Sequence, residues 1–124
     1  MDLSIEQALK ADEECNFQEA ERIYRAILEA HPKHPDANHN LALILASNKS
    51  GKAALPLFKT AHEANPNVEQ YWLSYIDALI SENQLEKANE IIFEGKKLGL
   101  AGENVDVLEA QLTKIMLAQP SKSV

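Results

Sequence analysis

The 124-residue sequence has one cysteine, four glycines, five prolines and only 6% aromatic residues. A single cysteine, Cys15, has no partner for an internal disulfide, which is consistent with a reducing compartment. Little glycine and proline alongside 45% hydrophobic residues is typical of a folded domain and excludes a low-complexity linker. The sequence therefore predicts one small folded domain, and we expect it in the cytoplasm.

Basic residues and long apolar runs are also scarce. The chain has 12 Lys and Arg against 19 Asp and Glu, a net charge of -7, and no cluster of basic residues. Phosphate backbones are bound by clustered Lys and Arg, so we expect no nucleic-acid partner. The longest apolar run is too short to cross a bilayer, and the first four residues lack the features of a signal peptide. No membrane partner is expected either.

Motifs that carry catalysis are missing as well. The sequence has no nucleotide-binding glycine loop, no GxSxG elbow and no HExxH helix. His31, His34 and His39 are spread across two prolines, so their rings need not converge on a metal. Acidic neighbours of Cys15 disfavour its thiolate. We therefore predict a protein that is not an enzyme and that holds no cofactor and no metal.

The informative feature that the sequence does have is a constant spacing of 34 residues, which we call the repeat interval. Three sets of residues recur at this interval: Ala20, Ala54 and Ala88; Tyr24, Phe58 and Ile92; Pro32 and Pro66. A constant interval indicates that one supersecondary unit is repeated. Such units bury their apolar faces only by stacking on one another, and the alanines mark where helices approach most closely.

Apolar residues within each unit recur at steps of three and four, which predicts amphipathic helices. Asn16 with Glu19 and Asn67 with Gln70 are expected to cap two of these helices, and Pro35 suits a first helical turn. Helices are predicted at 3–14, 17–30, 35–47, 52–64, 68–82, 85–98 and 103–118, with no strand.

The alanine, aromatic and proline pattern, together with Trp72, resembles tetratricopeptide (TPR) repeats over residues 1 to about 100. The resemblance implies an all-α, right-handed superhelical solenoid of three helix pairs plus a C-terminal capping helix. We expect a single domain over 1–118, with units at about 1–34, 35–68 and 69–102, the capping helix at 103–118 and a flexible tail or linker at 119–124.

Some positions depart from the family pattern. Cys15, Lys49 and Asn83 stand where the turn between the two helices of a unit usually has glycine, so a left-handed backbone is expected there. Asn83 tolerates this conformation, whereas it costs Cys15 and Lys49 about 1 kcal/mol each. Trp72 and Tyr75 are expected in the core, and Tyr71 is expected to be exposed.

The last predicted helix has one apolar side, formed by Val105, Leu108, Leu112, Ile115 and Met116. We expect this side to cover the apolar face of the preceding helix pair. The alternative is that the helix docks on a partner or on a second copy of the chain. A monomer is expected, with self-association left open.

The TPR resemblance also implies a ligand groove lined by the first helix of each unit. The candidate groove residues are Ile5, Leu9, His39, Asn40, Leu43, Gln70, Leu73, Ser74 and Asp77. The expected groove positions hold no Lys or Arg, which excludes the clamp that related repeats use for acidic chaperone tails. A segment with basic and apolar side chains suits this charge pattern better. Asn40 either binds a peptide backbone, as in sugar-transferase repeats, or is merely solvated.

These observations predict a non-catalytic scaffold that binds a protein or peptide segment in its groove. The alternative is an interaction or oligomerisation module at the N-terminus of a larger bacterial enzyme. Three stretches, which begin at Ala20, His31 and Gln70, resemble repeat modules that precede glycosyl-, sulfo- or methyltransferase domains in bacterial proteins.

Overall fold

A computed structural model describes residues 4–119, which form seven α-helices and no strand. None of these helices is both long and apolar enough to cross a membrane. Every predicted helix is present, and no boundary differs from its predicted position by more than two residues. The helices are α1 (Ile5–Glu13), α2 (Phe17–Ala30), α3 (Pro35–Ser47), α4 (Gly51–Ala64), α5 (Glu69–Ser81), α6 (Leu85–Lys97) and α7 (Glu103–Ala118).

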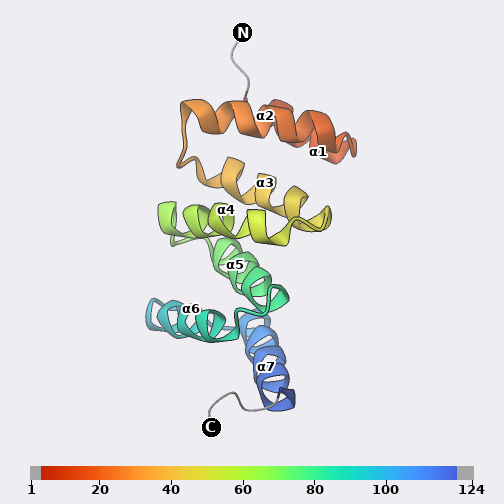
Figure 1. The fold of residues 1–124 in the computed structure, drawn as a ribbon. Helices are drawn as coiled ribbons and strands as arrows, with labels where there is room; N and C mark the ends of the chain where they lie inside the picture. The colour runs from red at the N-terminus through yellow and green to blue at the C-terminus, as the bar shows by residue number, and fades with distance from the viewer. Residues whose placement is uncertain (1–3, 120–124) are drawn as a thin grey trace.

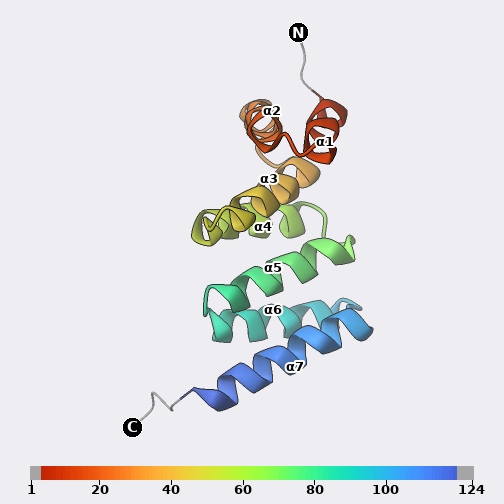
Figure 2. The same cartoon turned by 90° about the vertical axis from the view of Figure 1, so that its right-hand side faces the viewer.

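The helices stack in chain order, with α1 and α2 at one end of the molecule and α7 at the other (Figure 1). Each helix packs on the next one, and α7 packs on both α5 and α6 (Figure 2). The apolar core accordingly forms two clusters along the stack, one over α1 to α3 and one from α3 to α7. This arrangement confirms the all-α solenoid of three helix pairs followed by a seventh helix.

Local side chains start several of the helices. Ser4 and Gln7 form a reciprocal capping box at α1, and the Asn16 side chain accepts from the Glu19 backbone N–H at 3.4 Å, as predicted. Pro35 lies in the first turn of α3. The predicted cap of α5 by Asn67 is wrong: Val68 is the residue before this helix, and it has no side chain that can accept a hydrogen bond.

The turns inside the three helix pairs share one backbone geometry. Cys15, Lys49 and Asn83 have φ angles of 60°, 65° and 60°, which confirms the expected left-handed conformation. In each turn, the N–H of the residue after the left-handed one donates to a carbonyl near the end of the preceding helix. The acceptors are the carbonyls of Ala11, Leu45 and Leu79, and each N–O distance is 2.8 Å. These hydrogen bonds pair helix-end carbonyls that would otherwise lack a partner. The geometry recurs although glycine is absent from all three turns.

A second recurring contact anchors the first helix of a unit to the turn that precedes it. The Asn38 amide nitrogen donates to the Pro32 carbonyl at 3.0 Å, and the Trp72 indole nitrogen donates to the Pro66 carbonyl at 2.7 Å. Asn38 and Trp72 are one repeat interval apart, as are the two prolines. Different side chains therefore fulfil the same structural role at one repeat position.

Small and large residues meet at the helix crossings as the repeat predicts. Ala20, Ala54 and Ala88 are fully buried, and so are the bulky residues that recur beside them, Tyr24, Phe58 and Ile92. Trp72 and Tyr75 are also in the core, which confirms the prediction for both.

The C-terminal helix α7 covers the end of the stack. Val105 and Leu112 are buried in the core, and Leu108 and Ile115 pack against it. Met116 differs from the expectation, because it is 41% exposed although it lies on the same side of the helix. An ion pair between Lys96 of α6 and Glu109 adds a polar contact beside this apolar one. The proposed tail lies outside the described residues apart from Gln119, and the division into units stays a prediction.

Candidate binding groove

Two of the predicted groove residues join α3 to α5 through a hydrogen bond. The His39 Nε2 atom and the Ser74 hydroxyl are 2.8 Å apart, and the Gln70 side-chain nitrogen donates to the same hydroxyl at 3.0 Å. Both His39 and Ser74 are buried, and the His39 ring lies 4.9 Å from the ring of Tyr71. His39 and Ser74 therefore link α3 to α5, and the buried His39 ring offers little surface to a ligand.

The buried His39 ring is held in its neutral form. Burial lowers the pKa of His39, more than nearby Asn40 and Asp36 raise it. A neutral imidazole has one acceptor nitrogen, to which the Ser74 hydroxyl can donate while it accepts from Gln70. The three side chains thus satisfy one another within the protein.

Tyrosine and aspartate side chains make two further contacts between helices. The Tyr24 hydroxyl of α2 donates to Asp12 of α1 at 3.3 Å, and the Tyr71 hydroxyl of α5 donates to Asp36 of α3. Burial and the Asp36 carboxylate both raise the pKa of Tyr71. The prediction that Tyr71 is exposed is wrong, since only 6% of it is accessible. Tyr71 lies one repeat interval after the fully buried Ala37, so the repeat itself marks this position as internal.

Asn40 lies between the buried network and solvent. It is half-buried, and its amide is close enough to Tyr24 and His39 to influence the pKa of both. These contacts are within the protein itself, and a role for Asn40 in binding a peptide backbone stays a prediction.

Three predicted residues, Leu43, Ser74 and Asp77, line one pocket of about 200 Å³ between α3, α4 and α5. We call this the α3–α5 pocket. Leu43 is 44% exposed, and Asp77 is also exposed. Ser81, which the repeat also places on this face, lines the pocket too, together with six residues that were not expected in the groove: Ala46, Lys49, Gly51, Phe58, Ala78 and Glu82.

The other predicted groove residues do not line this pocket. Leu73 is buried in the core, and Ile5 is half-buried against the cluster formed by α1 to α3. Leu9 is exposed on α1, and Gln70 is exposed on α5. Ile5, His39 and Leu73 occupy the same repeat position in successive units. That position faces the neighbouring helices, which explains why His39 and Leu73 are covered.

The carboxylates at the predicted groove positions are free of ion pairs. Within the described residues, the four ion pairs use the acidic residues Glu19, Glu21, Glu90 and Glu109. Asp77 and Glu82 at the pocket are in none of these pairs. The pocket therefore combines apolar walls with negative charge that the protein leaves unpaired.

A second buried histidine, His62 of α4, packs against α5. The His62 ring stacks on Tyr75 at 5.0 Å and meets Trp72 edge-on at 4.6 Å, and its buried Nδ1 atom has no hydrogen-bond partner. Burial lowers the pKa of His62, more than Glu63 and Glu94 raise it. No three His, Cys, Asp or Glu side chains are grouped as a metal site requires in the part of the chain that the structure describes.

Because His39 and His62 are buried, we predict that the protein loses stability in acid. Because burial lowers the pKa of His39 and His62 in the folded chain, the unfolded chain binds more protons once the pH falls below about 6.5. The free energy of unfolding should be highest above this pH and fall below it, by at most about 1.4 kcal/mol per pH unit for each histidine. Urea unfolding at several pH values measures the slope. His62→Phe should flatten the slope, and His31→Gln, at an exposed position, should not.

Comparison with known proteins identifies the fold. No family model matches the sequence, and no curated protein matches it either. Among solved structures, this chain is similar to the first TPR domain of Spaghetti (RPAP3), which was solved bound to the HSP90 peptide SRMEEVD. The TM-score is 0.78 and the sequence identity is 17%, and the match covers 91% of this chain and 90% of that one.

Two further structures show the same arrangement of helices. The TPR domain of Sgt2 from Aspergillus fumigatus has a TM-score of 0.74 at 14% identity, covering 96% of this chain and 84% of that one. A double mutant of MamA RS-1 has a TM-score of 0.66 at 18% identity, covering 94% of this chain and 75% of that one. At these identities the likeness shows the fold, which is that of TPR domains.

Proposed function

We propose that this chain is a non-catalytic interaction module that binds a protein or peptide segment on the face formed by α1, α3 and α5. The observation that carries the proposal is the α3–α5 pocket, which joins three predicted groove residues to unpaired carboxylates. Prearranged helices lose little conformational freedom on binding, so affinity comes from shape and charge. No cofactor or metal is needed for this role.

The fold supports peptide binding, and the charges of this chain favour a particular kind of peptide. The Spaghetti domain was solved with a peptide, SRMEEVD, that contains two glutamates and one aspartate. The predicted groove positions here include four apolar residues and the carboxylate of Asp77, but no Lys or Arg. Like charges repel across an interface, so an acidic peptide should bind poorly. We propose a partner segment rich in basic and apolar side chains.

Selection from a random peptide library tests this function. Binders enriched on the native chain should be basic and apolar, and they should lose at least about tenfold in affinity when Leu43→Lys is introduced, because a positive charge that repels a basic segment replaces an exposed apolar contact. Leu117→Lys serves as the matched control, since Leu117 is 82% exposed on α7 and does not line the pocket. Acid-rich binders, or an equal loss with both variants, would contradict the proposal.

A second role stays a prediction from the sequence alone. In that reading the chain is the interaction or oligomerisation module of a larger bacterial transferase, and the groove would recruit the enzyme's partner. The same selection experiment applies, because the groove is the same in both cases.

A further inference from the structure

The size of the α3–α5 pocket points to a single side chain as its occupant. Its volume of about 200 Å³ compares with about 150 Å³ for a cavity that holds one benzene molecule. A helix or a stacked pair of side chains is too large for it. Leu43 and Ala46 of α3 and Ala78 of α5 supply apolar lining, and Phe58 of α4 lines the pocket from a fully buried position. Methylene groups fit such walls.

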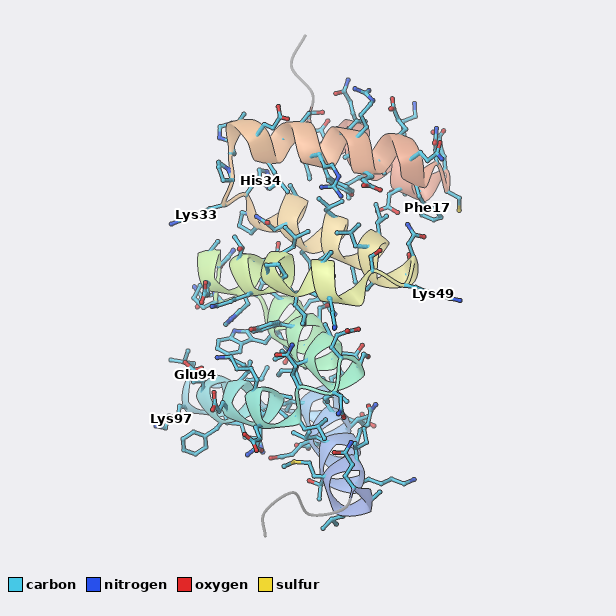
Figure 3. All side chains as sticks on the ribbon, viewed as in Figure 1. Phe17, Lys33, His34, Lys49, Glu94 and Lys97 are labelled. Carbon is cyan, nitrogen blue, oxygen red and sulfur yellow. The ribbon has the colours of Figure 1, made fainter. Side chains whose placement is uncertain are left out.

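The polar groups of the pocket select a positive charge. Asp77 and Glu82, both from the C-terminal half of α5 and its end, line the pocket and are in no ion pair within the described residues. Lys49 is the one basic residue of the lining, and its side chain extends outward from the turn before α4 (Figure 3). The two carboxylates are therefore left for a cation supplied from outside.

The Glu82 carboxylate lies beside the start of α4. A Cβ atom on Gly51 would collide with that carboxylate, so the absence of a side chain at Gly51 makes room for it. Ser50, the residue before α4, gives the helix no side-chain cap. The positive end of the α4 dipole stabilises an anion at this place. Glu82 is thus positioned at the edge of the pocket.

We propose that the α3–α5 pocket binds the side chain of an arginine residue in the partner segment. This inference rests on the proposed function and names the anchor of that interaction. The methylene stem lies against Leu43 and Ala78, and the guanidinium reaches Asp77 and Glu82. Arginine fits better than lysine because its planar group has five donors in a fixed arrangement and sheds water more easily.

The test adds N-acetyl-arginine amide as a probe to the isotope-labelled full chain and measures its binding by NMR. Saturable amide shifts are expected around Leu43, Asp77 and Glu82, with a dissociation constant on the order of 1–10 mM, typical of a small weak ligand. N-acetyl-citrulline amide has the same shape without the charge and should bind at least about tenfold more weakly. Asp77→Asn should weaken arginine binding by a similar factor, and Asp106→Asn, at an exposed position on α7, should leave it unchanged.

The outcomes distinguish a failure of the proposed arginine pocket from a failure of the proposed peptide-binding function. Equal binding of arginine and citrulline, shifts on other faces, or no saturation would overturn the arginine pocket. If library-selected peptides still bind at the groove in that case, the proposed function stands without this anchor. If arginine binds as expected but no selected peptide depends on Leu43, the pocket stands and the peptide-binding function fails. Unfolding curves of Asp77→Asn that match the native curve exclude misfolding as the cause of lost binding.

Discussion

Replacing Trp72 by alanine should lower the free energy of unfolding by about 3–5 kcal/mol. The side chain is 5% exposed, packs against His62 and donates its indole N–H to the Pro66 carbonyl. The substitution leaves a cavity between α4, α5 and α6 and removes the anchor of α5 to its preceding turn. Since small domains have only about 5–15 kcal/mol of stability, the loss is a large share of the total.

Phe93→Ala is the matched control for this substitution. Phe93 is also aromatic and also on the C-terminal half of the stack, but it is 61% exposed, and the Lys97 ammonium lies over its ring. Its loss should cost no more than about 1 kcal/mol. Urea unfolding followed by circular dichroism compares the two variants. Equal destabilisation would mean that Trp72 does not have the core position described above.

The second large effect is expected at the C-terminal helix. Leu112→Asp should cost at least about 4 kcal/mol, because it removes a fully buried apolar side chain and puts a carboxylate into the core. Leu112 is 1% exposed within the cluster that spans α3 to α7. The C-terminal end of the stack should lose its packing, and thermal unfolding should begin at a much lower temperature.

Leu117→Asp makes the same chemical change on the outer side of α7. Leu117 is 82% exposed, so the expected change is within about 0.5 kcal/mol. The pair separates the two roles that the sequence leaves open for this helix. A native-like unfolding curve for Leu112→Asp would show that α7 does not cap the stack and is free to dock elsewhere.

The helices could be predicted because the signals for them are local. Each is defined by apolar residues three and four apart, and the repeat interval brings back the same signals along the chain. The left-handed turns at Cys15, Lys49 and Asn83 could be expected for the same reason, since each one falls at a fixed point of the repeat. The C-terminal helix followed from a single apolar side, of which only Met116 is left largely exposed.

The candidate site could be predicted only in part because it depends on how three helices meet. The resemblance identified the helices that line the groove, and Leu43, Ser74 and Asp77 do share a pocket. Whether a residue is buried depends on the angle and spacing of the neighbouring helices. These helices cover His39 and Leu73. Glu82 reaches the pocket because α4 begins beside the end of α5, a long-range contact with no counterpart in the repeat pattern.

The central claim is that ligands bind on the face formed by α1, α3 and α5. The most direct test is an NMR titration of the labelled chain with a library-selected peptide. We predict amide shifts concentrated around Asn40 and Leu43 of α3 and Asp77 of α5, with α2 and α6 unchanged. Shifts concentrated on α2, α6 or the outer side of α7 would contradict the account.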